Sequence, residues 1–216
     1  MNNLKKKISN YDIIIFDLDD TIYSQKDYDN PALFCVSKFL AKEIKKDKKK
    51  IFKKLRILKK IRRGLASEPV FDTFLKDYKL INKKKTISYC VSLFQKYESK
   101  ELKKLKSLKT LLKSIYKKKN LFLVTNGAKI RQENKIKYLG IKNYFKKIFI
   151  LDGVKKEIKP STKNVKYLVN YLKENKNLKS VFVGDNKDSD HKFAKNLKIK
   201  FIFYQFPITK KTNNYV

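Results

Sequence analysis

The sequence predicts an α/β fold, in which a parallel sheet carries an inserted all-helical domain. Short apolar runs recur along the 216-residue chain, helical patterns separate the later runs, and a long stretch without a convincing strand follows the first. Together these features predict a core domain formed by residues 1–23 and 100–216, with a helical domain inserted at 24–99. Such a chain is long enough for one substantial domain and a smaller insert.

The strands of the sheet are predicted from five runs rich in β-branched and aromatic residues. They are residues 13–16, 121–124, 148–151, 181–183 and 201–204. Uninterrupted apolar runs of this length suit parallel strands that are covered on both faces. Helical patterns follow at 128–138, 162–174 and 189–197. Strands that alternate with helices indicate a Rossmann-like parallel sheet with right-handed crossovers.

The insert is predicted from amphipathic helical stretches between the first and second strands. Asn30 followed by Pro31 predicts an N-cap and a first helical position, opening a helix over 31–46. A second helix, 49–63, is expected to end at Gly64. Further helices are expected within 69–80 and 83–98, and a helix over 105–118 leads back to the second strand.

The chain is strongly basic, with a formal net charge of +35 and a sequence pI near 10.0. Nearly all of the cations are lysines; the arginines are Arg56, Arg62, Arg63 and Arg131. Proteins that recognise phosphates by geometry favour the bidentate guanidinium, so this lysine excess predicts a solvated cationic surface and no specific nucleic-acid partner. Attraction to polyanions is still expected, and it should weaken with salt.

Cysteine usage and hydropathy indicate the compartment. Cys35 and Cys90 lie far apart and form no CxxC pair, so they are expected to be small buried residues in a reducing environment. No segment reaches about 18 uncharged apolar residues, and the N-terminal apolar run is too short for a signal peptide. A soluble, cytoplasmic protein without a membrane partner is therefore expected. The oligomeric state is not predictable.

Carboxylates crowd the end of the first predicted strand, in the segment DIIIFDLDDT. Asp17 and Asp19 are two positions apart, so an extended chain directs their side chains to one side. In an open parallel sheet, ligands bind beyond the carboxyl ends of the strands. Because adjacent carboxylates repel each other, the pair predicts a counter-cation such as Mg²⁺, which prefers oxygen ligands.

The other strand ends supply groups that suit an anion or the metal. LVTNG places Thr125 and Asn126 after the second strand, and Lys159 precedes Pro160 after the third. The fourth run is followed by VGDNKDSD, which contains Asp185, Asp188 and Asp190. Acidic groups for a metal and polar or cationic groups for an anion, all at one edge, predict a phosphoryl-transfer site.

In order and spacing, DIIIFDLDDT, LVTNG, IKP and VGDNKDSD resemble the four motifs of the haloacid dehalogenase (HAD) superfamily, phosphatase type. Asp17, Asp19 and Thr21 match the first motif, Thr125 the second and Lys159 the third. In the fourth motif Asp185 matches the first acidic position, and either Asp190 or Asp188 fills the second. The 24–99 insert has the position of the family's helical (C1) cap.

The resemblance implies Mg²⁺-dependent hydrolysis of a small phosphorylated metabolite, a nucleoside monophosphate or a sugar phosphate, through an aspartyl-phosphate. Asp17 would be the nucleophile and Asp19 the general acid and base. Thr125, Lys159 and Asn126 would bind the phosphoryl group. The Asp17 carboxylate, the Asp19 main-chain carbonyl and Asp185 would hold the metal, supported by Asp190.

Two alternatives remain open. A metal-independent 2-haloacid dehalogenase of the same superfamily would use the nucleophilic aspartate alone; such enzymes lack the acid/base aspartate that this chain has as Asp19. A basic nucleic-acid-binding protein on a HAD scaffold would explain the charge. The five intact residues Asp17, Asp19, Thr125, Lys159 and Asp185 argue against this second alternative.

Overall fold

The computed structural model describes residues 2–61, 70–152 and 157–207. The chain divides into two compact units, one formed by Met1–Gln25 with Lys100–Ile208 and the other by Lys26–Ser99. The first unit contains the sheet, and the second contains helices α2 to α5. The sequence-based boundaries, 23/24 and 99/100, lie within two residues of this division.

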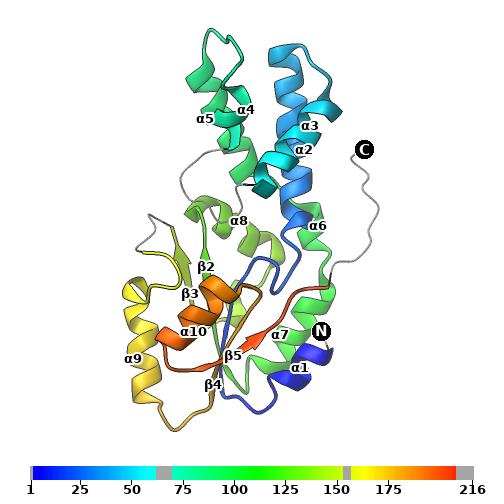
Figure 1. The fold of residues 1–216 in the computed structure, drawn as a ribbon. Helices are drawn as coiled ribbons and strands as arrows, with labels where there is room; N and C mark the ends of the chain where they lie inside the picture. Colours follow the sequence, from blue (N-terminus) through cyan, green and yellow to red (C-terminus); the bar gives the residue numbers. More distant parts are fainter. Residues whose placement is uncertain (1, 62–69, 153–156, 208–216) are drawn as a thin grey trace. The chain divides into compact units, whose positions relative to one another are not determined.

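A five-stranded parallel sheet forms the first unit (Figure 1). Its strands are β1 (Ile13–Phe16), β2 (Asn120–Asn126), β3 (Lys147–Leu151), β4 (Ser180–Gly184) and β5 (Lys200–Phe203). The strand order is β3-β2-β1-β4-β5, with Ile13 opposite Asn120 on one side and Ser180 on the other. The predicted α/β fold is confirmed, and the central position of β1 brings the ends of β2 and β4 beside its own.

The sheet is apolar on both faces, which explains its uninterrupted apolar runs. Ile13 and Ile15 pack into a core with Phe122 of β2 and Phe182 of β4. Helices α9 (Lys166–Glu174) and α10 (Lys192–Asn196) contribute Leu168, Phe193 and Ala194 to the same core. Ile14 and Phe16 alternate to the opposite face and are fully buried there as well.

Four further helices belong to this unit, and one of them, α8, follows β2. They are α1 (Asn2–Lys7), α6 (Lys100–Lys103), α7 (Lys106–Ile115) and α8 (Lys129–Leu139). Short turns of 3₁₀ type lie at Lys142–Tyr144 and Lys163–Val165, and a π-type turn at Lys187–His191 precedes α10. Helix α8 ends at Gly140, whose left-handed conformation (φ 62°) allows its N–H to bond the carbonyls of Ile136 and Lys137.

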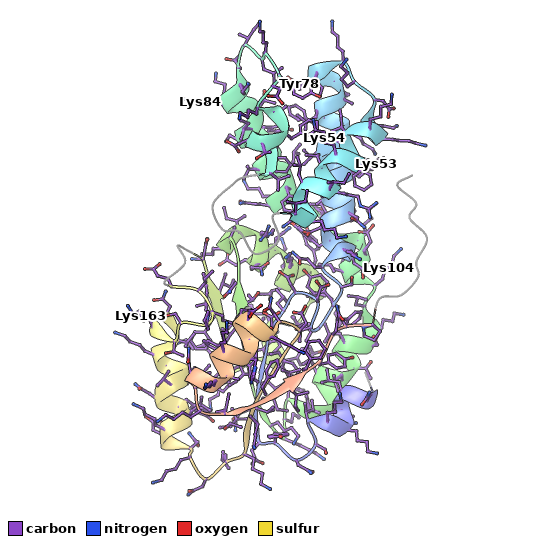
Figure 2. The ribbon with its side chains drawn as sticks, in the orientation of Figure 1. Lys53, Lys54, Tyr78, Lys84, Lys104 and Lys163 are labelled. Atoms are coloured by element: carbon purple, nitrogen blue, oxygen red, sulfur yellow. The ribbon has the colours of Figure 1, made fainter. Side chains whose placement is uncertain are left out.

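The second unit is helical, with α2 (Lys26–Ile44), α3 (Lys48–Ile61), α4 (Val70–Leu75) and α5 (Lys83–Gln95). Aromatic side chains connect these helices: Tyr28 of α2 meets Phe94 of α5 edge to face, with ring centroids 6.0 Å apart. Phe74 stacks on Tyr78, and the Nζ of Lys54 lies 5.5 Å from the centre of the Phe74 ring. Figure 2 labels Lys54 and Tyr78 in this unit. The long lysine side chains of α3 therefore cover apolar surface while their charges reach solvent.

The predicted start of α2 is wrong, because the helix begins at Lys26 and encloses Pro31. Pro31 is the sixth residue of this helix, so it removes the backbone donor that would reach the Asp27 carbonyl, a cost that the packing of the first turns must outweigh. Burial of Tyr28 and Asp29 and two acidic residues in the first turn, Asp27 and Asp29, favour the earlier start. The predicted stop at Gly64 lies outside the described residues.

Among the described residues, no helix is long and apolar enough to cross a membrane.

Candidate active site

The candidate site begins where β1 and β4 end. Asp17 continues β1, because its N–H donates to the Val183 carbonyl of β4 at 2.9 Å. The residue is only 6 % exposed. The backbone ladder thus fixes a buried carboxylate at the carboxyl edge of the central strand, where the strand order reverses and parallel sheets bind ligands.

Lys159 brings a buried ammonium to this carboxylate. Its Nζ lies 2.5 Å from Asp17 Oδ1 and 2.7 Å from Asp190 Oδ1. Although burial disfavours the charged form of Lys159, the two carboxylates raise its pKa above the ordinary value. Asn126 holds the backbone of this residue, since Asn126 Oδ1 accepts the Lys159 N–H at 3.0 Å. Asn126 therefore positions Lys159.

Three carboxylates form a cluster around Asp17 that could hold a metal ion. Asp17, Asp185 and Asp190 each place an oxygen within 4.8 Å of the others. Burial raises the pKa of Asp17, Lys159 lowers it and Asp190 raises it again, and the net direction is upward. When all three are ionised, three carboxylates beside one ammonium carry an excess of two negative charges, and oxygen donors with this excess fit a divalent cation such as Mg²⁺, which would favour the ionised form of Asp17.

The fourth-motif region presents Asp190, and not Asp188, to the cluster. Asp190 is 1 % exposed, and its Oδ2 accepts the Asn186 N–H at 3.1 Å. Gly184 makes room for it, because a Cβ at Gly184 would lie 2.4 Å from Asp190 Oδ2. Asp188 is on the surface, where its carboxylate meets Lys192 at 3.3 Å.

Asp19 faces a different set of partners, mostly on α8. Its oxygens lie 2.8 and 2.9 Å from Lys135 Nζ, and its Oδ2 accepts a hydrogen bond from Gln132 Nε2 at 3.1 Å. The Tyr23 hydroxyl donates to Oδ1. Burial alone would raise the pKa of Asp19, but the Lys135 ammonium and the Tyr23 hydrogen bond hold it well below its usual range. This environment favours the carboxylate, the form that can accept a proton.

Thr125, at the end of β2, shares Gln132 with Asp19. Its side chain is 1 % exposed, and Oγ1 lies 2.7 Å from Gln132 Nε2. The same amide nitrogen lies 3.0 Å from the Asn126 carbonyl. Because a carboxylate and a carbonyl can only accept, the group facing them is the NH₂ of Gln132. The two hydrogens of this NH₂ are shared among three acceptors, and because the amide nitrogen cannot itself accept, the Thr125 hydroxyl hydrogen is directed elsewhere.

Comparison with known proteins identifies the family. The profile of haloacid dehalogenase-like hydrolases matches residues 14–204, which include every candidate site residue. The chain belongs to this family. Among curated protein sequences, none matches it significantly.

Several solved structures of HAD proteins share the fold. A Clostridium difficile protein provisionally described as a phosphatase is 24% identical, with a TM-score of 0.56 over 91% of this chain and 87% of the other. Bacillus subtilis YfnB, provisionally described as a HAD hydrolase and crystallised with magnesium, is 17% identical, with a TM-score of 0.60 over 90% and 88% of the two chains. A Haemophilus somnus protein predicted to be a phosphoglycolate phosphatase is 19% identical, with a TM-score of 0.57 over 91% and 87%. At these identities the likeness shows the fold alone.

Within this HAD hydrolase, the residues selected from the motifs fall into two neighbouring groups. Asp17, Lys159, Asp185 and Asp190 form one group, while Asp19 and Thr125 meet at Gln132. The Asp19 carboxylate is outside the acidic cluster. That position is compatible with the expectation that its main-chain carbonyl, and not its side chain, would face a metal.

Sequence reasoning missed three side chains of the site: Tyr23, Gln132 and Lys135. Gln132 lies four and seven positions before Ile136 and Leu139, so a polar residue occupied the apolar face of a predicted helix. This was a usable signal. Lys135 gave no such signal, because the sequence contains many lysines and only the structure shows that this one is buried.

Proposed function

We propose that this HAD hydrolase is a Mg²⁺-dependent phosphomonoesterase that hydrolyses a small phosphorylated metabolite through an aspartyl-phosphate on Asp17. One observation carries the proposal: the buried Asp17 carboxylate contacts the Lys159 ammonium and belongs to one acidic cluster with Asp185 and Asp190. A nucleophile, a cation for phosphoryl oxygens and a candidate metal site thus meet at one strand end.

The residues divide the reaction into two displacements. An Asp17 oxygen attacks phosphorus, an O–P bond forms, and the bond from phosphorus to the ester oxygen breaks. Water then attacks the phosphorus of the acyl phosphate, releasing inorganic phosphate and restoring the Asp17 carboxylate. Mg²⁺, held by the Asp17 and Asp185 carboxylates and the Asp19 carbonyl with Asp190 in support, would offset the charge between the anionic nucleophile and the phosphate.

Lys159 and Thr125 are suited to bind the phosphoryl group. The Lys159 ammonium has three donors, of which Asp17 and Asp190 take two. The Gln132 amide nitrogen faces the Thr125 oxygen and cannot accept its hydrogen, so that hydrogen can reach a phosphoryl oxygen. Asn126 contributes by fixing the Lys159 backbone, a role inferred from its hydrogen bond and different from direct phosphate binding.

Asp19 would transfer the protons. As a carboxylate, Asp19 can take a proton from the attacking water in the second displacement. The donors around it orient its oxygens, and they also lower its basicity. In the first displacement Asp19 would donate a proton to the departing alkoxide. Asp19 must then be protonated, and the oxygen that carries the proton gives up a hydrogen bond from one of its present donors. The side chains that donate to Asp19 would therefore influence both proton transfers.

The substrate class is tested with the purified protein and a panel of phosphorylated metabolites. We expect turnover with Mg²⁺ and none with EDTA, with nucleoside monophosphates or sugar phosphates as the best substrates. Release of inorganic phosphate is the measurement. Dehalogenation of a 2-haloacid that survives EDTA, together with no phosphate release from any ester, would overturn the proposal in favour of a dehalogenase.

Substitution of the nucleophile provides the first prediction. Asp17→Asn retains the shape of the side chain but removes the anionic oxygen that forms the aspartyl-phosphate, so we expect turnover to fall by a factor of about 10³ or more. The fold should persist, as judged by circular dichroism. The matched control is Asp188→Asn, which removes an exposed carboxylate from the fourth-motif segment and should leave turnover unchanged. Full activity in the Asp17→Asn variant would remove Asp17 as the nucleophile.

A further inference from the structure

Two side chains of α8, Lys135 and Gln132, bind the Asp19 carboxylate, and neither belongs to the four sequence motifs. Lys135 is completely buried, and its Nζ contacts both Asp19 oxygens at 2.8 and 2.9 Å. Gln132, one turn earlier, is also completely buried and joins Asp19 to Thr125 through a single amide nitrogen. The side chain that would transfer protons and the side chain that would bind phosphate are therefore held from one helix.

Neither side chain is explained by stability alone. A buried ion pair gives little net stability over apolar residues of similar volume, because both charges lose their hydration. Gln132 Oε1 is buried without a hydrogen-bond partner among the described residues, which costs stability. A helix that only covered the sheet would be better served by leucine or methionine at both positions.

We propose that Lys135 and Gln132 are positioning residues that hold the Asp19 carboxylate in its working orientation, with Gln132 also orienting the Thr125 hydroxyl. The proposal rests on the proposed phosphatase function and adds residues to its site. Lys135 fixes both carboxylate oxygens through one ammonium, and the Tyr23 hydroxyl and Gln132 each bind one of them. Rotation of Asp19 would break several of these contacts at once.

The kinetic test uses Lys135→Met, Lys135→Arg and Asp19→Asn, with Lys137→Met as the matched control. Lys137 is on the same helix but exposed. Loss of Asp19 positioning should matter most for a poor leaving group, which needs a proton. For Lys135→Met we expect kcat/KM to fall about 30-fold or more with an alkyl phosphate and less than about fivefold with 2,4-dinitrophenyl phosphate. Lys135→Arg should recover part of the loss, and Lys137→Met should behave as wild type.

The same variants separate a positioning role from a structural one. In the Asp19→Asn background, Lys135→Met should reduce kcat/KM by less than about twofold further, because the residue it positions is already disabled. Equal losses with both leaving groups, or losses that multiply in the double variant, would overturn the proposal.

A double-mutant cycle of unfolding temperatures, measured in EDTA, tests the contact between Lys135 and Asp19 without turnover. Asp19→Asn leaves the Lys135 charge without this carboxylate and should lower the unfolding temperature, and adding Lys135→Met should raise it again. Additive shifts would refute the ion pair as a coupled unit. If the wild type hydrolysed no phosphate ester, the proposed function would fail, whereas this cycle would still decide whether α8 holds Asp19.

Discussion

Gly184 shows how one missing side chain shapes the site. A Cβ at this position would lie 2.4 Å from Asp190 Oδ2 and 2.7 Å from its Cβ and Cγ. Gly184→Ala should therefore displace Asp190, which bonds Lys159, and destabilise the fold by about 1–3 kcal/mol. Turnover should fall as well. Thermal unfolding and kcat measure the two effects, with Ser180→Ala at the opposite end of β4 as the control. An unchanged unfolding temperature would show that Asp190 can move at no cost.

Cys90 provides a prediction about pH at the residue scale. Burial, together with the Glu43 carboxylate, raises the pKa of the Cys90 thiol to about 12. At pH 8 the thiolate fraction of such a group is roughly one in ten thousand, against roughly a quarter for an ordinary cysteine of pKa about 8.5. Iodoacetamide should therefore leave Cys90 unlabelled in the folded protein at pH 8, and its labelling rate should rise about tenfold with each unit of pH up to about 12.

Peptide mapping by mass spectrometry measures this labelling, and Cys35→Ser leaves Cys90 as the single thiol. Cys35 is half-buried and should react first in the wild type. Denaturant should make Cys90 reactive at pH 8. Rapid labelling of Cys90 without denaturant would mean that α5 opens readily or that its thiol is not buried.

At the scale of elements, the strands were predictable and the ends of helices less so. Strands covered on both faces must be apolar at every position, so runs such as 13–16 are visible in the sequence itself. The start of α2 was missed because Asn30 and Pro31 form a local start signal that the packing of Tyr28 outweighs. Lys135 escaped because its importance comes from burial against Asp19, 116 positions away in the chain.

Helix α8 provides a prediction that separates its stability from its role in the site. Gly140 ends the helix at φ 62°, a conformation that costs a residue with a Cβ about 1–2 kcal/mol. Gly140→Ala should lower the free energy of unfolding by about this amount, and Gly140→Asn by less, because asparagine tolerates the left-handed region. Turnover should persist in both, since Gln132 and Lys135 lie at least one turn earlier. Denaturant titration and kcat measure the two effects, and a turnover loss equal to that of Lys135→Met would contradict this separation.

At the scale of the whole molecule, the dominant physical property is a net charge of +35. Most lysines extend into solvent; Lys84 and Lys163, labelled in Figure 2, are two exposed examples from the two units. Buried cations are the exception, and Lys135 and Lys159 each contact a carboxylate of the site. The surface charge and the site charge are therefore separate features, and salt should act on them differently.

Like charges on the surface repel one another, and salt screens this repulsion as the Debye length falls from about 30 Å at 0.01 M to about 10 Å at 0.1 M. We expect NaCl over this range to raise the unfolding temperature, with sucrose as a control for osmotic effects.

Over the same range, binding to heparin or to DNA of any sequence should weaken steeply, because it depends on counterion release. Fluorescence anisotropy with two unrelated DNA sequences measures this binding. Tight binding that persists above about 0.3 M salt and distinguishes the two sequences would instead indicate a specific nucleic-acid site on this surface.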